Sequence, residues 1–178
     1  MTDHLTITLK KPVELLGETW SSLTVREPTG GELLAVDPFN GVTADIVGVS
    51  RVSGVPQAVV RMMPASVLVR SASFIGSTLA VPADFLAVDV LPDELDLPLR
   101  QSVTHGDREI SILHLREPSG ADLEAIDKIK GWARDIASVA AMSGLPREVV
   151  EKVLGGDIKR GAIFFESFTA AAPTTGGN

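Results

Sequence analysis

The stretch Arg26-Glu27-Pro28-Thr29-Gly30 recurs ninety positions later as Arg116-Glu117-Pro118-Ser119-Gly120. At the same offset, residues 5–80 align with residues 95–170 without a gap, and 26 of the 76 positions are identical. A match of this length at one fixed offset indicates an internal repeat. The sequence therefore predicts two tandem copies of one structural unit.

The repeat sets the expected domain organisation. Residues 1–80 contain the first copy and residues 95–170 the second. The connector between them, residues 81–94, has four acidic side chains and no basic one, so we expect a solvated linker. Residues 171–178 are small and polar, and we expect a disordered tail. The sequence leaves open whether the copies pack as a pseudo-dimer or stay separate.

Within each copy, alternating apolar residues over 5–9 and 20–26, and over 95–99 and 110–116, predict a β-hairpin. Proline in the repeated pentad ends the second strand. The hydroxyl of Thr29 or Ser119, with an acid three residues later, has the spacing of a helix N-cap. We therefore interpret the pentad as a strand-to-helix corner braced by Arg–Glu pairs. Its residues are Arg26, Glu27, Pro28, Thr29, Arg116, Glu117, Pro118 and Ser119.

Four short helices should follow each hairpin. We expect them at residues 32–36, 45–52, 56–63 and 67–79, and at 122–129, 135–142, 146–154 and 158–170. Gly54 and Gly144 are placed to end the second helix of each set in the left-handed conformation. Ser66 and Asp157 are candidate N-caps of the last helices. The predicted fold class is α+β, dominated by helices.

The sequence has few of the residue patterns that are typical of catalytic, metal-binding or phosphate-binding sites. The three histidines are scattered, cysteine is absent, and no glycine-rich phosphate loop is present. Acids kept in both copies could serve acid–base catalysis, but caps and ion pairs explain them as well. We therefore predict no catalytic residue, no metal ligand and no cofactor. The net charge of -7 argues against a nucleic-acid partner. The lack of a long apolar run and of a secretory signal argues for a cytoplasmic protein without a membrane partner.

The copies differ most in charge. Residues 46–83 contain three arginines and no acid, whereas the matching part of the second copy carries eight charged side chains. An apolar helix of this kind is either buried on several sides or binds a partner, and the two can coexist. The candidate partner-binding residues are Val52, Val59, Met62, Met63, Val69, Phe165 and Phe168.

The order of motifs resembles a known family. Residues 115–123 read Leu-Arg-Glu-Pro-Ser-Gly-Ala-Asp-Leu, residues 143–150 read Ser-Gly-Leu-Pro-Arg-Glu-Val-Val, and Asp157 precedes the last helix. This order is similar to the small tail assembly chaperones of Mu-like and related contractile-tailed bacteriophages. The first copy matches over residues 25–33 and 52–60, but has Val67 in place of the aspartate. Family members are usually about one copy long, so the duplication is a departure.

The resemblance implies a non-catalytic protein of the host bacterial cytoplasm. Such a chaperone binds the long tape measure protein, keeps it soluble, helps tail tube subunits gather round it, and is absent from the mature virion. Self-association is a further contact that the sequence leaves open. The competing hypothesis is a minor structural component of the phage tail or baseplate, and an enzyme is the third.

Overall fold

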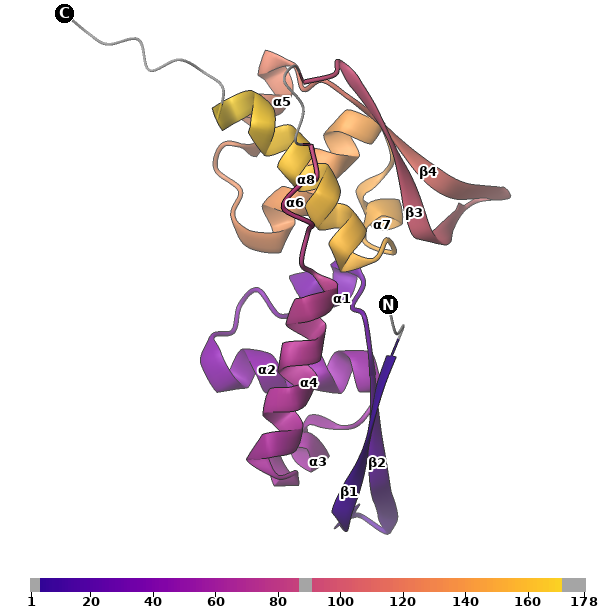
Figure 1. Ribbon diagram of the computed structural model, residues 1–178, viewed down its shortest axis with the longest axis vertical. Coiled ribbons are helices and arrows are strands. Elements are labelled where there is room, and N and C mark those ends of the chain that lie inside the picture. Colours follow the sequence, from indigo (N-terminus) through magenta and orange to yellow (C-terminus); the bar gives the residue numbers. More distant parts are fainter. Residues whose placement is uncertain (1–3, 87–90, 171–178) are drawn as a thin grey trace, which may run out of the picture. The chain divides into compact units, whose positions relative to one another are not determined.

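The computed structural model describes residues 4–86 and 91–170 (Figure 1). The chain divides into two compact units, Met1–Ala80 (unit 1) and Val81–Asn178 (unit 2). Each unit has one antiparallel hairpin followed by four helices, which confirms the predicted α+β fold and its duplication. The structure includes residues 81–86 and 91–93 in unit 2, so a separate acidic connector stays a prediction. The predicted disordered tail lies outside the described residues.

The elements of the two units follow the same order. Those of unit 1 are β1 (His4–Leu15), β2 (Glu18–Arg26), α1 (Gly30–Leu34), α2 (Gly41–Ser53), α3 (Gln57–Met62) and α4 (Ala65–Thr78). Those of unit 2 are β3 (Glu94–His105), β4 (Arg108–Arg116), α5 (Gly120–Ile126), α6 (Gly131–Ser143), α7 (Arg147–Val150) and α8 (Gly155–Ala170). Figure 1 shows α4 crossing α2 beside the hairpin of unit 1, and α8 crossing α6 in unit 2.

Both hairpins are interrupted at the same place. In unit 1 the pairing passes from Thr8 with Ser22 to Val13 with Trp20, so residues 9–12 lie opposite Ser21 alone. In unit 2 the same irregularity leaves residues 99–102 opposite Ser111. An insertion of this kind bends the strand and increases its twist. The apolar residues on one face of each hairpin still reach the core of their unit.

Each unit has its own apolar core. The core of unit 1 joins the hairpin to α2, α3 and α4 and consists of Ile7, Leu9, Val13, Leu23, Val25, Val49, Val52, Val55, Val59, Val60, Met63 and Val67. The largest fully buried side chains of unit 2 come from its hairpin and from α6 and α8, and are Leu97, Leu113, Leu115, Ile136, Met142, Ile158, Phe164 and Phe165.

The helix ends test the sequence predictions directly. Gly54 (φ 72°) and Gly144 (φ 67°) end α2 and α6 in the left-handed region, as predicted. Ser66 is not an N-cap, because α4 begins at Ala65 and Pro64 occupies the capping position in an extended conformation. Asp157 is not an N-cap either, since α8 begins two residues earlier, at Gly155. The helix predicted over residues 146–154 is shorter and ends at Val150.

Candidate functional site

A hollow of about 120 Å³ lies in unit 1 between α1, α2 and α4. We call it the apolar socket, and its lining consists of Pro28, Glu32, Leu33, Val36, Ala44, Asp45, Gly48, Val52, Ala72 and Ile75. Eight of these ten residues have no charged side chain, and the two carboxylates are Glu32 and Asp45. The socket is therefore suited to an apolar side chain rather than to a polar ligand.

Small side chains keep the socket open. Ala44, Gly48 and Val52 are four residues apart and share one face of α2, and Ala72 faces them from α4. A Cβ atom placed on Gly48 would lie 3.8 Å from Cγ2 of Val36, which is an ordinary contact. Alanine would therefore fit at position 48, whereas a larger side chain would enter the hollow.

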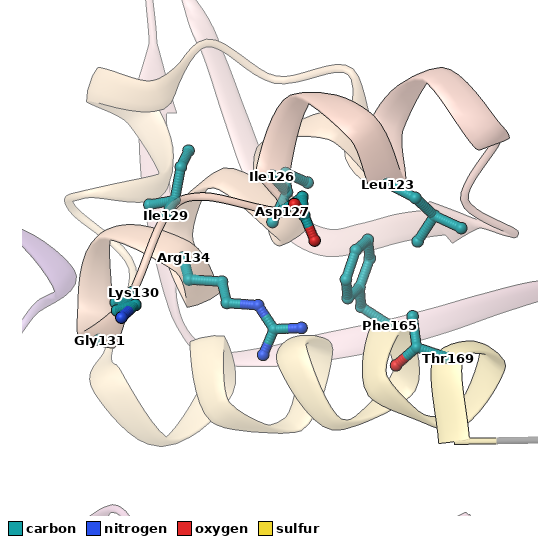
Figure 2. A pocket seen from close by; sticks show the side chains of 9 residues that line it. All are labelled: Leu123, Ile126, Asp127, Ile129, Lys130, Gly131, Arg134, Phe165 and Thr169. Atoms are coloured by element: carbon teal, nitrogen blue, oxygen red, sulfur yellow. The ribbon is translucent and has the colours of Figure 1, made fainter.

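Unit 2 has a hollow at the corresponding place, with a volume of about 530 Å³ (Figure 2). We call it the cationic hollow. Figure 2 shows α5 on one side, α8 with Phe165 on the other, and the Arg134 side chain extending between them. Its lining consists of Leu123, Ile126, Asp127, Ile129, Lys130, Gly131, Arg134, Phe165 and Thr169.

The offset of ninety residues relates the two hollows. Leu33, Val36, Ala44 and Ile75 in the apolar socket match Leu123, Ile126, Arg134 and Phe165 in the cationic hollow. Both units thus form a hollow between the same three helices. The chemistry differs, because unit 2 has arginine where unit 1 has alanine and a phenyl ring where unit 1 has isoleucine.

The two units differ in how their second and last helices pack. A Cβ atom on Gly161 of α8 would come within 2.7 Å of Cγ2 of Val139 on α6, so the two helices approach closely there. The matching residue of unit 1 is Ser71, which is fully buried and donates a hydrogen bond to the carbonyl of Val67. The seam between α2 and α4 thus accommodates a side chain that the seam between α6 and α8 excludes.

Exposed apolar side chains occur on α2 and α4. Val42 is 64% exposed and Val69 is 61% exposed. The matching side chains of unit 2 are Trp132 and Lys159, whose ammonium lies 4.6 Å from the indole centroid and 2.5 Å from an oxygen of Asp135. Asp45, which lines the socket, matches Asp135. The cation that covers this position in unit 2 is therefore replaced by an exposed valine in unit 1.

The predicted partner-binding residues fall into two groups. Met62 is 55% exposed at the end of α3, and Val69 is exposed on α4, so both are accessible. Phe168 is partly buried and packs edge-to-face on Phe164, with centroids 5.1 Å apart. The other four predicted residues, Val52, Val59, Met63 and Phe165, are buried, and of these Val52 lines the apolar socket and Phe165 lines the cationic hollow.

Sequence reasoning missed the small residues of the socket. Ala44, Gly48 and Ala72 are not among the candidate partner-binding residues that the sequence indicated. The available signal was the four-residue spacing of Ala44, Gly48 and Val52, which places them in one row along a helix. Nothing in the sequence alone shows that a row of small residues faces a gap rather than a close helix contact.

The repeated pentad forms a strand-to-helix corner braced by an ion pair. In unit 1, Arg26 donates two hydrogen bonds to the carboxylate of Glu32, at 2.9 and 2.6 Å, and a third to the carbonyl oxygen of Glu27. The backbone N–H of Thr29 also donates to Glu32. Burial opposes ionisation of Glu32, yet these hydrogen bonds outweigh it and lower the pKa of the carboxyl group. The same pairing raises the pKa of Arg26.

The corner of unit 2 repeats this arrangement with a shorter acid. Arg116 donates to Asp122 at 2.9 Å, and the hydroxyl and N–H of Ser119 donate to the same oxygen at 2.6 and 2.8 Å. The hydrogen bond from Arg116, followed by that from Ser119, lowers the pKa of Asp122 to about 2. Since the carboxylates are engaged in holding the corner, the corner is structural.

Unit 2 also has a buried ion cluster that the sequence did not predict. The Asp157 side chain is fully buried and accepts hydrogen bonds from the N–H and Nε of Arg100, at 3.0 and 2.8 Å, and from Arg160 at 2.5 Å. It therefore ties the irregular part of β3 to the first turn of α8. In unit 1 the matching residue is Val67, a member of the apolar core.

Within residues 4–86 and 91–170, no group of three or more metal-ligating side chains is close enough to hold an ion. Across the same residues, no helix combines the length and apolar content needed to cross a bilayer.

Comparison with known proteins gives the family. A family model described as "Phage tail assembly chaperone proteins, E, or 41 or 14" matches residues 6–77 and matches again over residues 96–169. The chain belongs to the phage tail assembly chaperone family. The predicted resemblance and the tandem duplication are thus confirmed. Comparison with curated proteins and with solved structures gave no match. Membership of this family implies protein partners in tail assembly.

Proposed function

We propose that this tail assembly chaperone binds the phage tape measure protein through the apolar face of unit 1 and keeps it soluble. This face consists of the apolar socket with Val42 and Val69 beside it. We further propose that the bound chaperone helps tail tube subunits assemble round the tape measure protein. The family membership supports the assembly role, and the apolar face supports a binding mode.

The single observation that carries the proposal is the size and lining of the socket. An apolar cavity of roughly 150 Å³ in another protein accepts benzene. A hollow of about 120 Å³ is therefore of the right order for one aliphatic side chain of a partner. Burying such a side chain contributes about 1.5–3 kcal/mol, which is a substantial share of a moderate affinity.

A helical partner fits this face best. An amphipathic helix that binds in a groove presents anchors three or four residues apart. One anchor would enter the socket while its neighbours cover the exposed side chains of Val42 and Val69. A long helical tape measure protein could repeat such anchors many times and so be covered by several chaperones.

Solubility would come from the charged parts of the chain. Residues 46–83 contain no acid, while the second copy and the connector carry most of the acidic side chains. We propose that the protein acts in the host bacterial cytoplasm before assembly and is absent from the mature virion. Mass spectrometry of purified particles tests this, and stoichiometric incorporation would support a structural tail or baseplate component instead.

Filling the socket tests the binding mode. The change Gly48→Leu places a side chain in the hollow, while Gly48→Ala is the matched control, since its Cβ makes only an ordinary contact. Both changes favour the helix by about 1 kcal/mol over glycine, so folding should be retained. With co-expressed tape measure protein, we expect Gly48→Leu to reduce the soluble fraction strongly and Gly48→Ala to leave it unchanged.

Charge on the apolar face gives a second test. Val69→Glu introduces a carboxylate beside the socket, and Met62→Glu introduces one at the end of α3. Folding of both variants is checked by circular dichroism. We expect Val69→Glu to weaken solubilisation of the tape measure protein, because binding of its apolar anchor side chain would bury the introduced carboxylate. Normal solubilisation by folded Gly48→Leu and Val69→Glu proteins would reject this face.

A further inference from the structure

The cationic hollow of unit 2 combines an apolar floor with basic groups at its edge. Ile126 and Phe165 are buried at the floor, and Leu123 is 37% exposed. Lys130 and Arg134 supply two positive charges to the lining, against the single carboxylate of Asp127. This pairing of apolar and cationic surface differs from the apolar socket of unit 1.

The two positive charges are specific to the second copy. Lys130 matches Asn40 and Arg134 matches Ala44, whereas Asp127 matches Asp37. Four of the positions that line the hollow have counterparts in the socket, and only one of these, Arg134, differs in charge. The same place in the fold thus has a net positive lining in one unit and an acidic rim in the other.

Both cations have hydrogen-bonding capacity to spare. The ion pair of Arg134 with Glu166 has an N–O distance of 3.4 Å, and both side chains are substantially exposed. Such a pair is weak, and a guanidinium has five N–H donors, so Arg134 can also bind an incoming carboxylate. Lys130 forms no ion pair within the described parts of the chain.

We propose that the cationic hollow binds a helical segment of a partner protein that presents an apolar side chain followed, three or four residues on, by a carboxylate. The apolar side chain would contact Leu123 and Phe165, and the carboxylate would reach Lys130 and Arg134. This spacing matches one turn of a helix. The proposal rests on the role in protein binding proposed above, but not on the apolar socket.

The test uses the full chain and overlapping peptides that cover the tape measure and tail tube proteins of the same phage. Binding of labelled peptides is measured by fluorescence anisotropy. The variant Lys130→Asn/Arg134→Ala places the residues of the first copy in the hollow. Lys128→Asn is the matched control, because Lys128 is an exposed base in the loop between α5 and α6 that also contains Lys130, but it does not line the hollow.

We expect a set of peptides with the apolar–acidic spacing to bind about threefold to tenfold more weakly to the double variant. Replacing the peptide's Glu by Gln should weaken binding to the original protein by a similar factor and leave binding to the double variant unchanged. Lys128→Asn should bind as the original protein does. Undiminished binding to the double variant, or the lack of any acid-dependent peptide, overturns the proposal.

The experiments distinguish failure of the cationic hollow from failure of the apolar socket. If Gly48→Leu impairs solubilisation of the tape measure protein while the double variant binds every peptide normally, the cationic hollow is rejected and the socket stands. If Gly48→Leu has no effect while acid-dependent binding is lost in the double variant, the socket is rejected and the cationic hollow stands.

Discussion

At the corner of unit 2, one carboxylate oxygen of Asp122 accepts hydrogen bonds from Arg116 and from Ser119. This arrangement explains why the pentad tolerates Thr or Ser at its fourth position and Glu or Asp three residues later. The hydroxyl caps the helix, and the acid holds the arginine that ends the strand. Residue identity matters here through hydrogen bonding and not through chemistry on a substrate.

The change Asp122→Asn should destabilise unit 2 by about 1 kcal/mol near neutral pH, the usual value of a helix cap. The folded pKa of about 2 lies below the unfolded value near 3.9, so the stabilising contribution is complete above about pH 4. It is lost as the pH falls from about 4 to 2. Urea unfolding across this range should therefore show the variant and the original protein converging in stability at the acidic end.

Glu124→Gln is the control for this measurement, because it removes an exposed carboxylate from the same helix without a corner contact. A difference between Asp122→Asn and the original protein that persisted undiminished at pH 2 would contradict the assigned role.

Residue roles at the corner were only partly predictable. The hydroxyl caps at Thr29 and Ser119 follow from a three-residue spacing, which is a local signal. The Arg26 side chain reaches the carboxylate of Glu32, six residues further on, because the strand ends and the chain turns between them. Side-chain pairing of that kind depends on the path of the backbone, which the sequence pattern does not give.

At the scale of elements, the two units differ in the contact between the last helix and the second helix. Gly161 permits close approach in unit 2, and Ser71 occupies the matching position in unit 1. The sequence predicted each helix found in residues 4–86 and 91–170, because apolar spacing and glycine stops are local signals, although the predicted caps Ser66 and Asp157 were wrong. It did not predict how closely the helices of each pair approach, since that depends on side chains that meet from distant positions.

Gly161→Ser transfers the residue of unit 1 into the close contact of unit 2. Its Cβ would lie 2.7 Å from a methyl of Val139, so α8 and α6 must move apart. We expect a loss of about 1–3 kcal/mol of unfolding free energy, the usual cost of overpacking. Gly76→Ala in α4 is the control, because nothing lies within 4 Å of its Cβ position. Gly76→Ala should stabilise unit 1 slightly. If Gly161→Ser did not lower the unfolding free energy of unit 2, the close contact between α6 and α8 would be refuted.

At the scale of the whole molecule, two units with separate cores predict two unfolding transitions. Each unit has one tryptophan, Trp20 in unit 1 and Trp132 in unit 2. Trp132→Phe leaves fluorescence that reports unit 1, and Trp20→Phe leaves fluorescence that reports unit 2. The duplication and the charge contrast between the copies were evident from the sequence, but the two hollows required the structure.

The buried Asp157 allows the transitions to be separated. Asp157→Val introduces the residue found in unit 1 and leaves Arg100 and Arg160 without their shared partner. We expect the unfolding free energy of unit 2, reported by Trp132, to fall by about 3 kcal/mol. The unfolding free energy of unit 1, reported by Trp20, should stay unchanged. A shift of both transitions by the same amount would show that the units unfold as one.

The interrupted hairpins have a consequence for the protein at high concentration. A long, regular strand with an open edge invites other chains to add to it as further strands. In both hairpins the run of four residues opposite a single serine breaks the ladder, and in unit 1 that run contains Lys10, Lys11 and Pro12. Fibre-like growth along this edge is thereby obstructed, so copies of the protein can accumulate without adding to one another strand by strand.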